Sequence, residues 1–369
     1  MKDSEDIAGI GIPFAAGVAA GAILTAYLSH IPLSIPLFLS VLIPIMTALT
    51  LIRSDDTHPR MASLAILFLA TGVFCSINAA ISEGIPSPME RMSALAIRSG
   101  ERMKDLIASI PYPSQTTGPL VKALLTGDRG DLEKGVIETF RASGASHILA
   151  LSGLHLGIIY LILSKITSPL GNSPSSKRAR AIITLVSAGF YTLMTGASPS
   201  IVRAFLFITI GETSKLLSRK ISPSRILLSA LTIQLVLKPG VIDSTGFQLS
   251  YLAMAGIVFI YPGLEKLYPR AKGLPGQLDP MRKIWSGAVL SISCQIFTAP
   301  LVWSRFHSFP KYFLITNLTA LPLTSAVMVL SVTTIALSGL GICPDFLVTM
   351  NDQSVQALIE CLKIISCSL

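Results

Sequence analysis

His147, Ser152 and His155 lie in an apolar stretch with the sequence FRASGASHILALSGLHLGIIY, residues 140–160. On one continuous helix at about 100° per residue, His147, Ser152 and His155 fall within an arc of about 140°. Gly153 and Gly157 then occupy a different face, where small residues four positions apart allow a close helix contact. Because ionisable groups are costly inside a bilayer, we predict that the polar face lines a path. For each histidine, a neutral ring bonded to a backbone carbonyl is the structural alternative.

A single arginine stands in the sequence TGASPSIVRAFLF, residues 195–207. Ser198 followed by Pro199 is typical of a helix start, with the serine as N-cap and the proline at the first helical position. Arg203 then lies one turn inside the helix, where a permanent charge needs water or a partner. Its guanidinium either extends back to the membrane interface or faces an aqueous cavity.

Side-chain amides recur in later apolar stretches, as Gln248 in the sequence GFQLS and as Gln295 and Asn317. A single buried amide usually bonds two helices together, and otherwise it lines a pore. Several such groups in one bundle predict a polar interior and hence a pathway. The residues that we place on this pathway are His147, Ser152, His155, Arg203 and Gln248.

The sequence ALLTGDRGDL, residues 123–132, precedes the two histidines. We assign Asp128 and Arg129 to the outer mouth of the pathway, as a local charge pair. The five histidines and five cysteines lack the spacing of a metal site, with no C-x-x-C pair and no H-x-H-x-D-H motif. We therefore expect no metal, no cofactor and no catalytic residue.

The composition indicates the environment of these residues. Charged residues are 13% of the 369 residues, hydrophobic residues are 51%, and the mean hydropathy is +0.66. Half the charge of a typical globular protein excludes a soluble enzyme and a disordered chain, and predicts an all-α polytopic membrane protein. Apolar stretches long enough to cross a bilayer predict about ten spans, at residues 8–29, 33–52, 62–82, 146–165, 180–195, 199–217, 224–238, 247–267, 284–304 and 311–341. In the last span, Asn317 and Pro322 predict a broken helix or a re-entrant segment.

Lysines and arginines concentrate in alternate short loops, which favours a cytoplasmic N-terminus. The stretch 83–145 then lies outside the cytoplasm. Within it, residues 89–110 have apolar side chains at helical spacing among several arginines, which predicts an amphipathic basic helix. Such a helix either lies on the bilayer surface or guides a nucleic-acid strand. Short helices around 120–125 and 132–142 and an amphipathic segment at 348–365 complete the predicted elements.

The strings GDR, FRASGASHILALSGLH, GASPSIVRA, GFQLS and NLTALPL occur in this order between about residue 118 and residue 345. Their order and spacing resemble the membrane-embedded competence region of the ComEC family, the channel proteins of DNA uptake in natural transformation. The resemblance implies a multi-pass plasma-membrane channel that passes single-stranded DNA to the cytoplasm. We divide the chain into a three-helix segment 1–82, an amphipathic helix and linker 83–117, and a competence membrane domain 118–369.

Two domains of longer family members have no counterpart in this pattern. Residues 83–117 leave no room for the family's oligonucleotide-binding domain, and no metallo-β-lactamase-like nuclease motif is present. The chain therefore resembles a minimal or truncated member. It also has no G-x-x-x-x-G-K phosphate loop, which together with the resemblance implies a separate motor ATPase, a DNA receptor and a separate nuclease as partners besides the lipid bilayer. The oligomeric state is left open.

Two other functions fit parts of the pattern. An intramembrane hydrolase would use Ser152 with His155 or His147, although the string A-L-S-G departs from the G-x-S-G of rhomboid proteases and no third group orients the imidazole. A small-molecule or ion transporter would bind its substrate through Arg203, Asp243 and the histidines, although the two halves show no inverted repeat. Both stay open as alternatives to the channel.

Overall fold

The computed structural model describes residues 13–21, 23, 66, 69, 72–73, 88–171, 173–218, 220–268, 279–307 and 312–367 of the chain. The chain divides into two compact units. One unit combines Met1–Ser87 with Leu206–Tyr251, and the other combines Pro88–Phe205 with Leu252–Leu369. Each unit is therefore discontinuous in sequence, and two of the boundaries fall inside helices, at residues 205/206 and 251/252. The sequence-based division at residues 82 and 117 stays a prediction.

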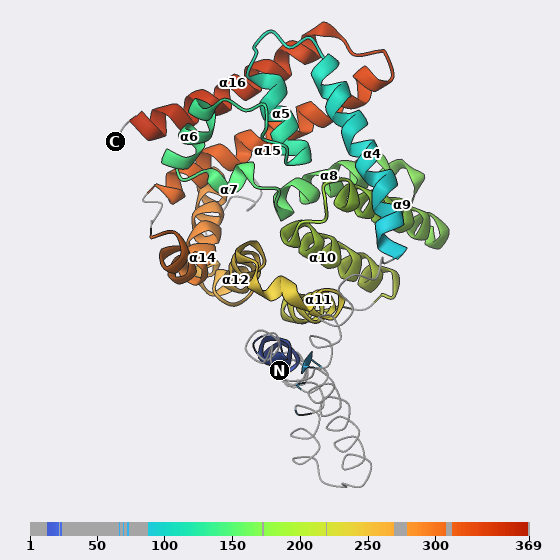
Figure 1. Cartoon of the computed structure of the whole chain (residues 1–369), viewed down its shortest axis with the longest axis vertical. Coiled ribbons are helices and arrows are strands. Elements are labelled where there is room, and N and C mark those ends of the chain that lie inside the picture. Colours follow the sequence, from blue (N-terminus) through green and yellow to red (C-terminus); the bar gives the residue numbers. More distant parts are fainter. Residues whose placement is uncertain are drawn as a thin grey trace, which may run out of the picture. The chain divides into compact units, whose positions relative to one another are not determined.

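In the unit that begins at Pro88, the described residues form helices joined by turns and loops (Figure 1). Its first half contains α4 (Pro88–Ser109), α5 (Thr117–Thr126), α6 (Lys134–Ala142), α7 (Ser146–Leu149), α8 (Gly153–Ile166), α9 (Pro174–Met194) and the start of α10 (Pro199–Leu216). Its second half contains the end of α12 (Thr245–Phe259), α13 (Tyr261–Glu265), α14 (Pro280–Phe306), α15 (Phe313–Gly339) and α16 (Asp345–Cys367). The other unit holds α11 (Pro223–Leu237), in which Gln234 Oε1 accepts a hydrogen bond from Tyr251 Oη at 3.0 Å.

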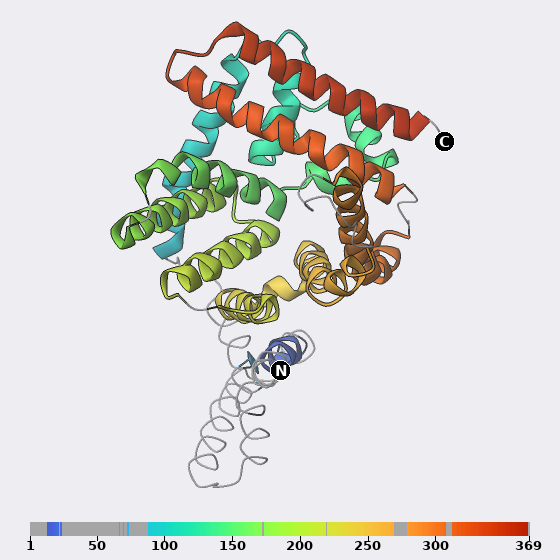
Figure 2. The ribbon, with the colours of Figure 1, turned by 180° about the vertical axis from the view of Figure 1, so that it is seen from behind.

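The hydrophobic core of the unit that begins at Pro88 joins its short helices to a helical hairpin. α15 and α16 run side by side, as the two opposite views show (Figures 1 and 2). Met328 of α15 and Leu358 of α16 are fully buried in one cluster with Leu120 of α5 and Phe140 of α6. Burying a side chain of this size contributes roughly 1.5–3 kcal/mol. The hairpin therefore holds α5 and α6 in place.

The amphipathic helix predicted at residues 89–110 is confirmed as α4. It packs along α9 and α5. Gly100 permits this approach, because a Cβ there would lie 3.1 Å from the Met194 carbonyl oxygen. α4 is thus part of a packed helical unit.

Three helices, α9, α11 and α14, begin at a proline that follows a serine or an aspartate. The side chains of Ser173, Ser222 and Asp279 each accept a backbone N–H of the helix that begins at the next residue. α10 begins at Pro199 as predicted, but the Ser198 hydroxyl is buried and makes no capping hydrogen bond. In the turn before α10, Gly196 and Ala197 adopt left-handed backbone conformations, with φ values of +79° and +48°. Ser198 therefore occupies the predicted N-cap position, with its carbonyl accepting the Val202 N–H at 3.0 Å, but its side chain does not cap the helix.

Within the described ranges, four helical stretches are long and apolar enough to cross a membrane, namely Gly153–Leu170, Thr245–Glu265, Pro280–Phe306 and Phe313–Gly339. They confirm the all-α membrane fold. The predicted spans at 180–195, 199–217 and 224–238 coincide with α9, α10 and α11, while those at 8–29, 33–52 and 62–82 lie largely outside the described residues.

The predicted interruption of the last span is wrong. α15 continues through Asn317 and Pro322 for 27 residues. Proline removes a single N–H donor from a helix, and the packing of α15 along α16 keeps the remaining turns in line.

Candidate functional site: a capped helix break beside a buried arginine

The apolar stretch that carries the two histidines is divided between two helices. α7 and α8 are separated by residues 150–152, in which Ala150 and Ser152 are extended, and Ser152 is the N-cap of α8. Ser152 Oγ accepts the Leu154 N–H at 3.3 Å, and the Ser152 N–H donates to His155 Nδ1 at 3.1 Å. This is a capping box with histidine in the place of the usual glutamate or glutamine. The single helix predicted over 146–165 is therefore wrong.

His155 is fully buried, and the cap fixes the orientation of its ring. Because Nδ1 accepts the Ser152 N–H, the neutral ring carries its proton on Nε2. That nitrogen is buried and has no hydrogen-bond partner among the described residues. A donor left in this state costs about 1–3 kcal/mol, so the site gains from any acceptor that enters it. His147 belongs to α7 and is exposed, so it does not share a helix face with Ser152 and His155.

Arg203 of α10 lies against the first turn of α8, and its side chain is 9% exposed. A Cβ at Gly153 would lie 3.1 Å from Arg203 Nη2 and 3.3 Å from Ala204 Cβ. The arginine is therefore buried between helices and does not extend to the surface. The predicted small-residue contact is present at Gly153 but not at Gly157, where a Cβ would have no heavy atom within 4 Å.

The turn that follows α5 packs on the same helix break. Gly127 ends α5 with a φ of +79°, and a Cβ there would lie 2.5 Å from Leu151 Cδ1. Arg129 donates from Nε and Nη2 to the Leu149 carbonyl oxygen at 3.2 and 2.8 Å. Because α7 ends at Leu149, no following helical turn supplies an N–H to that carbonyl. Arg129 supplies the missing donors and holds the end of α7.

Asp128 makes its contacts away from Arg129. Its carboxylate lies 3.1 Å from Lys104 Nζ and 3.2 Å from Lys122 Nζ, and it accepts the Gly130 N–H at 3.0 Å. The Gly130 N–H and the two lysines hold the pKa of Asp128 well below its usual range. The expected local charge pair of Asp128 with Arg129 is therefore wrong: Asp128 ties α4 to α5, and Arg129 binds the helix break. Their assignment to the outer mouth stays a prediction.

The three amides predicted for the interior are in different situations. Gln248 belongs to the unit that contains α11, and its Nε2 donates to the Ile242 carbonyl oxygen at 2.8 Å. Gln295 Nε2 on α14 and Asn317 Oδ1 on α15 are buried without a hydrogen-bond partner in the described part of the chain. Unpaired polar atoms of this kind are rare in protein cores and call for water or a ligand. In the described ranges, no three His, Cys, Asp or Glu side chains are grouped to hold a metal ion.

Gly153 is in close contact with α10, whereas Gly157 has open space around it. We therefore predict that alanine at these two positions changes the stability in opposite directions. Gly153→Ala should lower the thermal stability of the purified protein by about 1 kcal/mol, because its Cβ presses on Ala204 and Arg203. Gly157→Ala should raise it by up to about 1 kcal/mol, because alanine favours a helix and the space is open. Thermal unfolding in lipid nanodiscs measures both. Equal shifts for the two variants would contradict the close contact of α8 with α10.

The sequence contains a local signal for the break between α7 and α8, although the break lies inside a continuous apolar stretch. Ser152 and His155 have the spacing of a capping box, and a serine followed by glycine favours an N-cap over a helix interior. The contact of Arg129 with the Leu149 carbonyl had no such signal, nor did the hydrogen bond from Tyr191 Oη to the Leu125 carbonyl at 2.8 Å. Both join residues that only the tertiary fold brings together.

The described fold and this site define an all-α membrane protein with a charged residue buried among its helices. The chain belongs to the Competence protein family, whose model matches residues 124–367, the range that holds the turn after α5, the helix break and Arg203. This confirms the family resemblance that the motifs indicate.

Three curated relatives are similar to parts of the chain. ComE operon protein 3 of Bacillus subtilis (strain 168) is 27% identical over 197 residues, which are 53% of this chain and 23% of that protein. Competence protein ComA of Neisseria gonorrhoeae is 26% identical over 214 residues, 57% of this chain and 29% of that protein. The uncharacterized protein YcaI of Escherichia coli (strain K12) is 26% identical over 261 residues, 69% of this chain and 33% of that protein. The chain thus spans a third or less of the length of each of these relatives, and no solved structure matches it.

Proposed function

We propose that this chain forms part of a channel that passes single-stranded DNA across the plasma membrane in natural transformation, with its N-terminus in the cytoplasm. Its place in the Competence protein family supports a role in competence. The proposal makes the chain a conduit and not an enzyme. The residues it assigns to the DNA path are His147, Ser152, His155, Arg203 and Gln248.

The observation that carries the proposal is the burial of Arg203 against the first turn of α8. A helix N-terminus has a partial positive charge of about one half, and Arg203 adds a full charge beside it. Two positive groups in an apolar environment attract an anion, and single-stranded DNA presents a phosphate at every nucleotide. A guanidinium has five N–H donors, so Arg203 can keep a protein acceptor and also bind a phosphate oxygen.

Buried polar atoms in the same unit as Arg203 support the same function. His155 Nε2, Gln295 Nε2 and Asn317 Oδ1 offer neutral donors and acceptors to a hydrated strand. Neutral groups bind phosphate weakly, which lets the strand move on. In this proposal the driving force comes from a separate motor ATPase, a separate receptor delivers the DNA, and a separate nuclease supplies the single strand.

Uptake of fluorescent transforming DNA into the cytoplasm tests the proposal. The assay compares the parent strain, a strain that lacks the gene, and that strain with the chain restored from a plasmid or with the empty plasmid. We expect uptake to be lost in the deletion strain and restored by the chain. Normal uptake in the deletion strain would contradict the proposal and favour the transporter.

The contact between Ser152 Oγ and His155 Nδ1, at 3.0 Å, is the one observation that favours the hydrolase instead. The capping box explains this contact structurally, so replacing the hydroxyl should cost only the cap. We expect Ser152→Ala to lower stability by about 1 kcal/mol and to keep at least half of the native uptake. Ser152→Asn preserves a capping oxygen and should match the native protein more closely. A hydrolase would lose its function completely in both variants, because neither keeps a nucleophile.

A further inference from the structure

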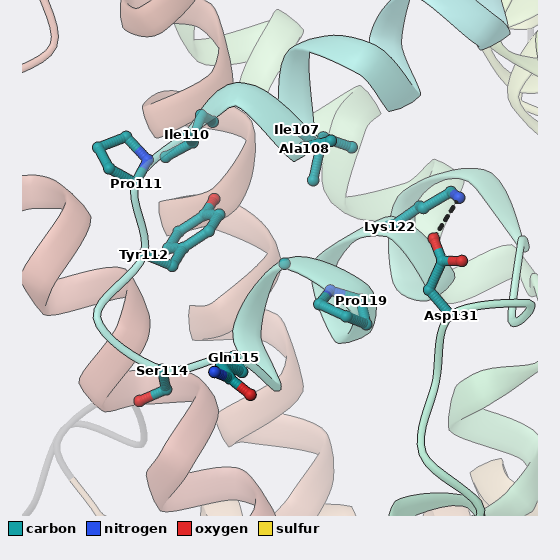
Figure 3. Close-up of a pocket in the computed structure, with 11 residues that line it drawn as sticks. Ile107, Ala108, Ile110, Pro111, Tyr112, Ser114, Gln115, Pro119, Lys122 and Asp131 are labelled. Carbon is teal, nitrogen blue, oxygen red and sulfur yellow. Dashed lines mark hydrogen bonds and ion pairs between the residues drawn. The ribbon is translucent and has the colours of Figure 1, made fainter.

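A pocket with a volume of about 330 Å³ lies between the end of α4, the loop that follows it and the first turns of α5 (Figure 3). Its walls are mainly apolar and include Ile107, Pro111, Pro119 and the ring of Tyr112. This volume is near the lower end of the range for small-molecule sites, which is roughly 300–1,000 Å³. The pocket therefore suits one flat group the size of a nucleoside and is too small for a folded partner.

The Tyr112 ring is held in place by Asn351, which lies outside the pocket, and by Gly118 of the pocket wall. Asn351 Nδ2 of α16 donates to Tyr112 Oη at 3.2 Å, and a Cβ at Gly118 would lie 3.7 Å from Tyr112 Cδ2. Asn351 is itself fully buried and accepts the Ser331 hydroxyl at 3.1 Å. Burial raises the pKa of Tyr112 to about 12, so the phenol is neutral at physiological pH. The ring is thus a rigid, uncharged face, which is what base stacking requires.

The polar groups of the pocket stand at separate ends (Figure 3). Gln115 offers an amide donor and an amide acceptor at one end. At the other end, Lys122 Nζ lies 2.7 Å from Asp131 Oδ2 and 3.2 Å from Asp128 Oδ2. Two carboxylates neutralise the one ammonium, so the pocket does not attract phosphate. Its paired donors and acceptors match the edge of a nucleobase, which also presents both.

We propose that this pocket binds one base of single-stranded DNA, with the base against the Tyr112 ring and the phosphates outside. This inference rests on the proposed function, because it takes its ligand from there. Exposed arginines of α4, at positions 98 and 102, can hold the phosphates while the pocket holds the base. The pocket would then align the strand before it reaches Arg203.

Photo-crosslinking of the purified chain in nanodiscs tests the base pocket. The probe is a short oligothymidylate that contains one 5-iodouracil, a base analogue that crosslinks to aromatic side chains. Trypsin releases the peptide from Asp105 to Lys122, in which Tyr112 is the one aromatic residue. We expect the crosslink on this peptide. An abasic oligonucleotide of equal length should compete about tenfold more weakly than unmodified oligothymidylate, because it keeps the phosphates and loses the bases.

Two matched variants locate the crosslink. Ala108→Leu fills the pocket from its wall without adding an aromatic target and should lower the crosslink yield at least fivefold. Ser109→Leu adds the same side chain at the neighbouring exposed position, which does not line the pocket, and should leave the yield unchanged. A crosslink that survives Ala108→Leu, or equal competition by the abasic strand, would overturn the base pocket. So would the absence of any crosslink in a chain that restores DNA uptake, and a peptide partner would then become the better occupant.

Discussion

Replacing Arg203 by alanine should lower cytoplasmic uptake of fluorescent DNA at least tenfold. The side chain is buried against Gly153, so a phosphate that it binds exchanges few contacts with water. A charge-assisted hydrogen bond in such surroundings contributes about 1.5–3 kcal/mol, which corresponds to roughly a ten- to hundredfold change in occupancy. Arg203→Lys keeps the charge but loses the planar fork of donors, so its uptake should fall between the native and alanine values.

A matched control separates the role of Arg203 from a general need for positive charge. Arg178, in the first turns of α9, is exposed, and Arg178→Ala should leave uptake within about twofold of native. Immunoblots of membrane fractions must show equal amounts of all variants. If Arg203→Ala protein is present at the native level and takes up DNA normally, the phosphate role of this arginine is wrong. If its level falls, Arg203→Lys decides, because it fills most of the same volume.

Local signals in the sequence predict most of the described helices. α14 and α10 follow from their apolar length and from a proline at the first helical position, which are properties of the segment alone. The break between α7 and α8 does not follow from hydropathy, because both sides of it are apolar. Pro322 causes the opposite error, because it predicts a break where α15 is continuous. Packing on α16 outweighs the loss of one N–H donor.

At the candidate site, the side-chain contacts that depend on how the helices pack could not be predicted from the sequence either. The position of Arg203 one turn inside α10 could be read from the sequence, but its contact with Gly153 depends on how α8 packs on α10. The sequence places Asp128 and Arg129 next to each other, which suggests a pair. In the fold they point to different partners, because the turn after α5 lies between α4 on one side and the end of α7 on the other.

The second large effect is expected at Asp352, a buried carboxylate of α16 that binds the start of α5. It accepts hydrogen bonds from the Ser114 N–H at 3.2 Å, from the Ser114 hydroxyl at 2.8 Å and from the Thr117 hydroxyl. Thr116, the N-cap of α5, makes no side-chain cap, so Asp352 stabilises this helix start from another helix. Asp352→Ala leaves three donors without an acceptor, and we expect a loss of about 3 kcal/mol in the free energy of unfolding.

The control for Asp352 is another acidic residue of the same helix. Glu360 is exposed and pairs with Lys363 at 2.7 Å, so Glu360→Ala should cost less than about 0.5 kcal/mol. Asp352→Asn keeps one acceptor oxygen and should lose less than Asp352→Ala. Unfolding curves in nanodiscs measure all three. Because Ser114 and Thr117 border the loop that carries Tyr112, Asp352→Ala should also weaken the crosslink of the iodinated strand, and equal stability of the three variants would show that α16 does not anchor this loop.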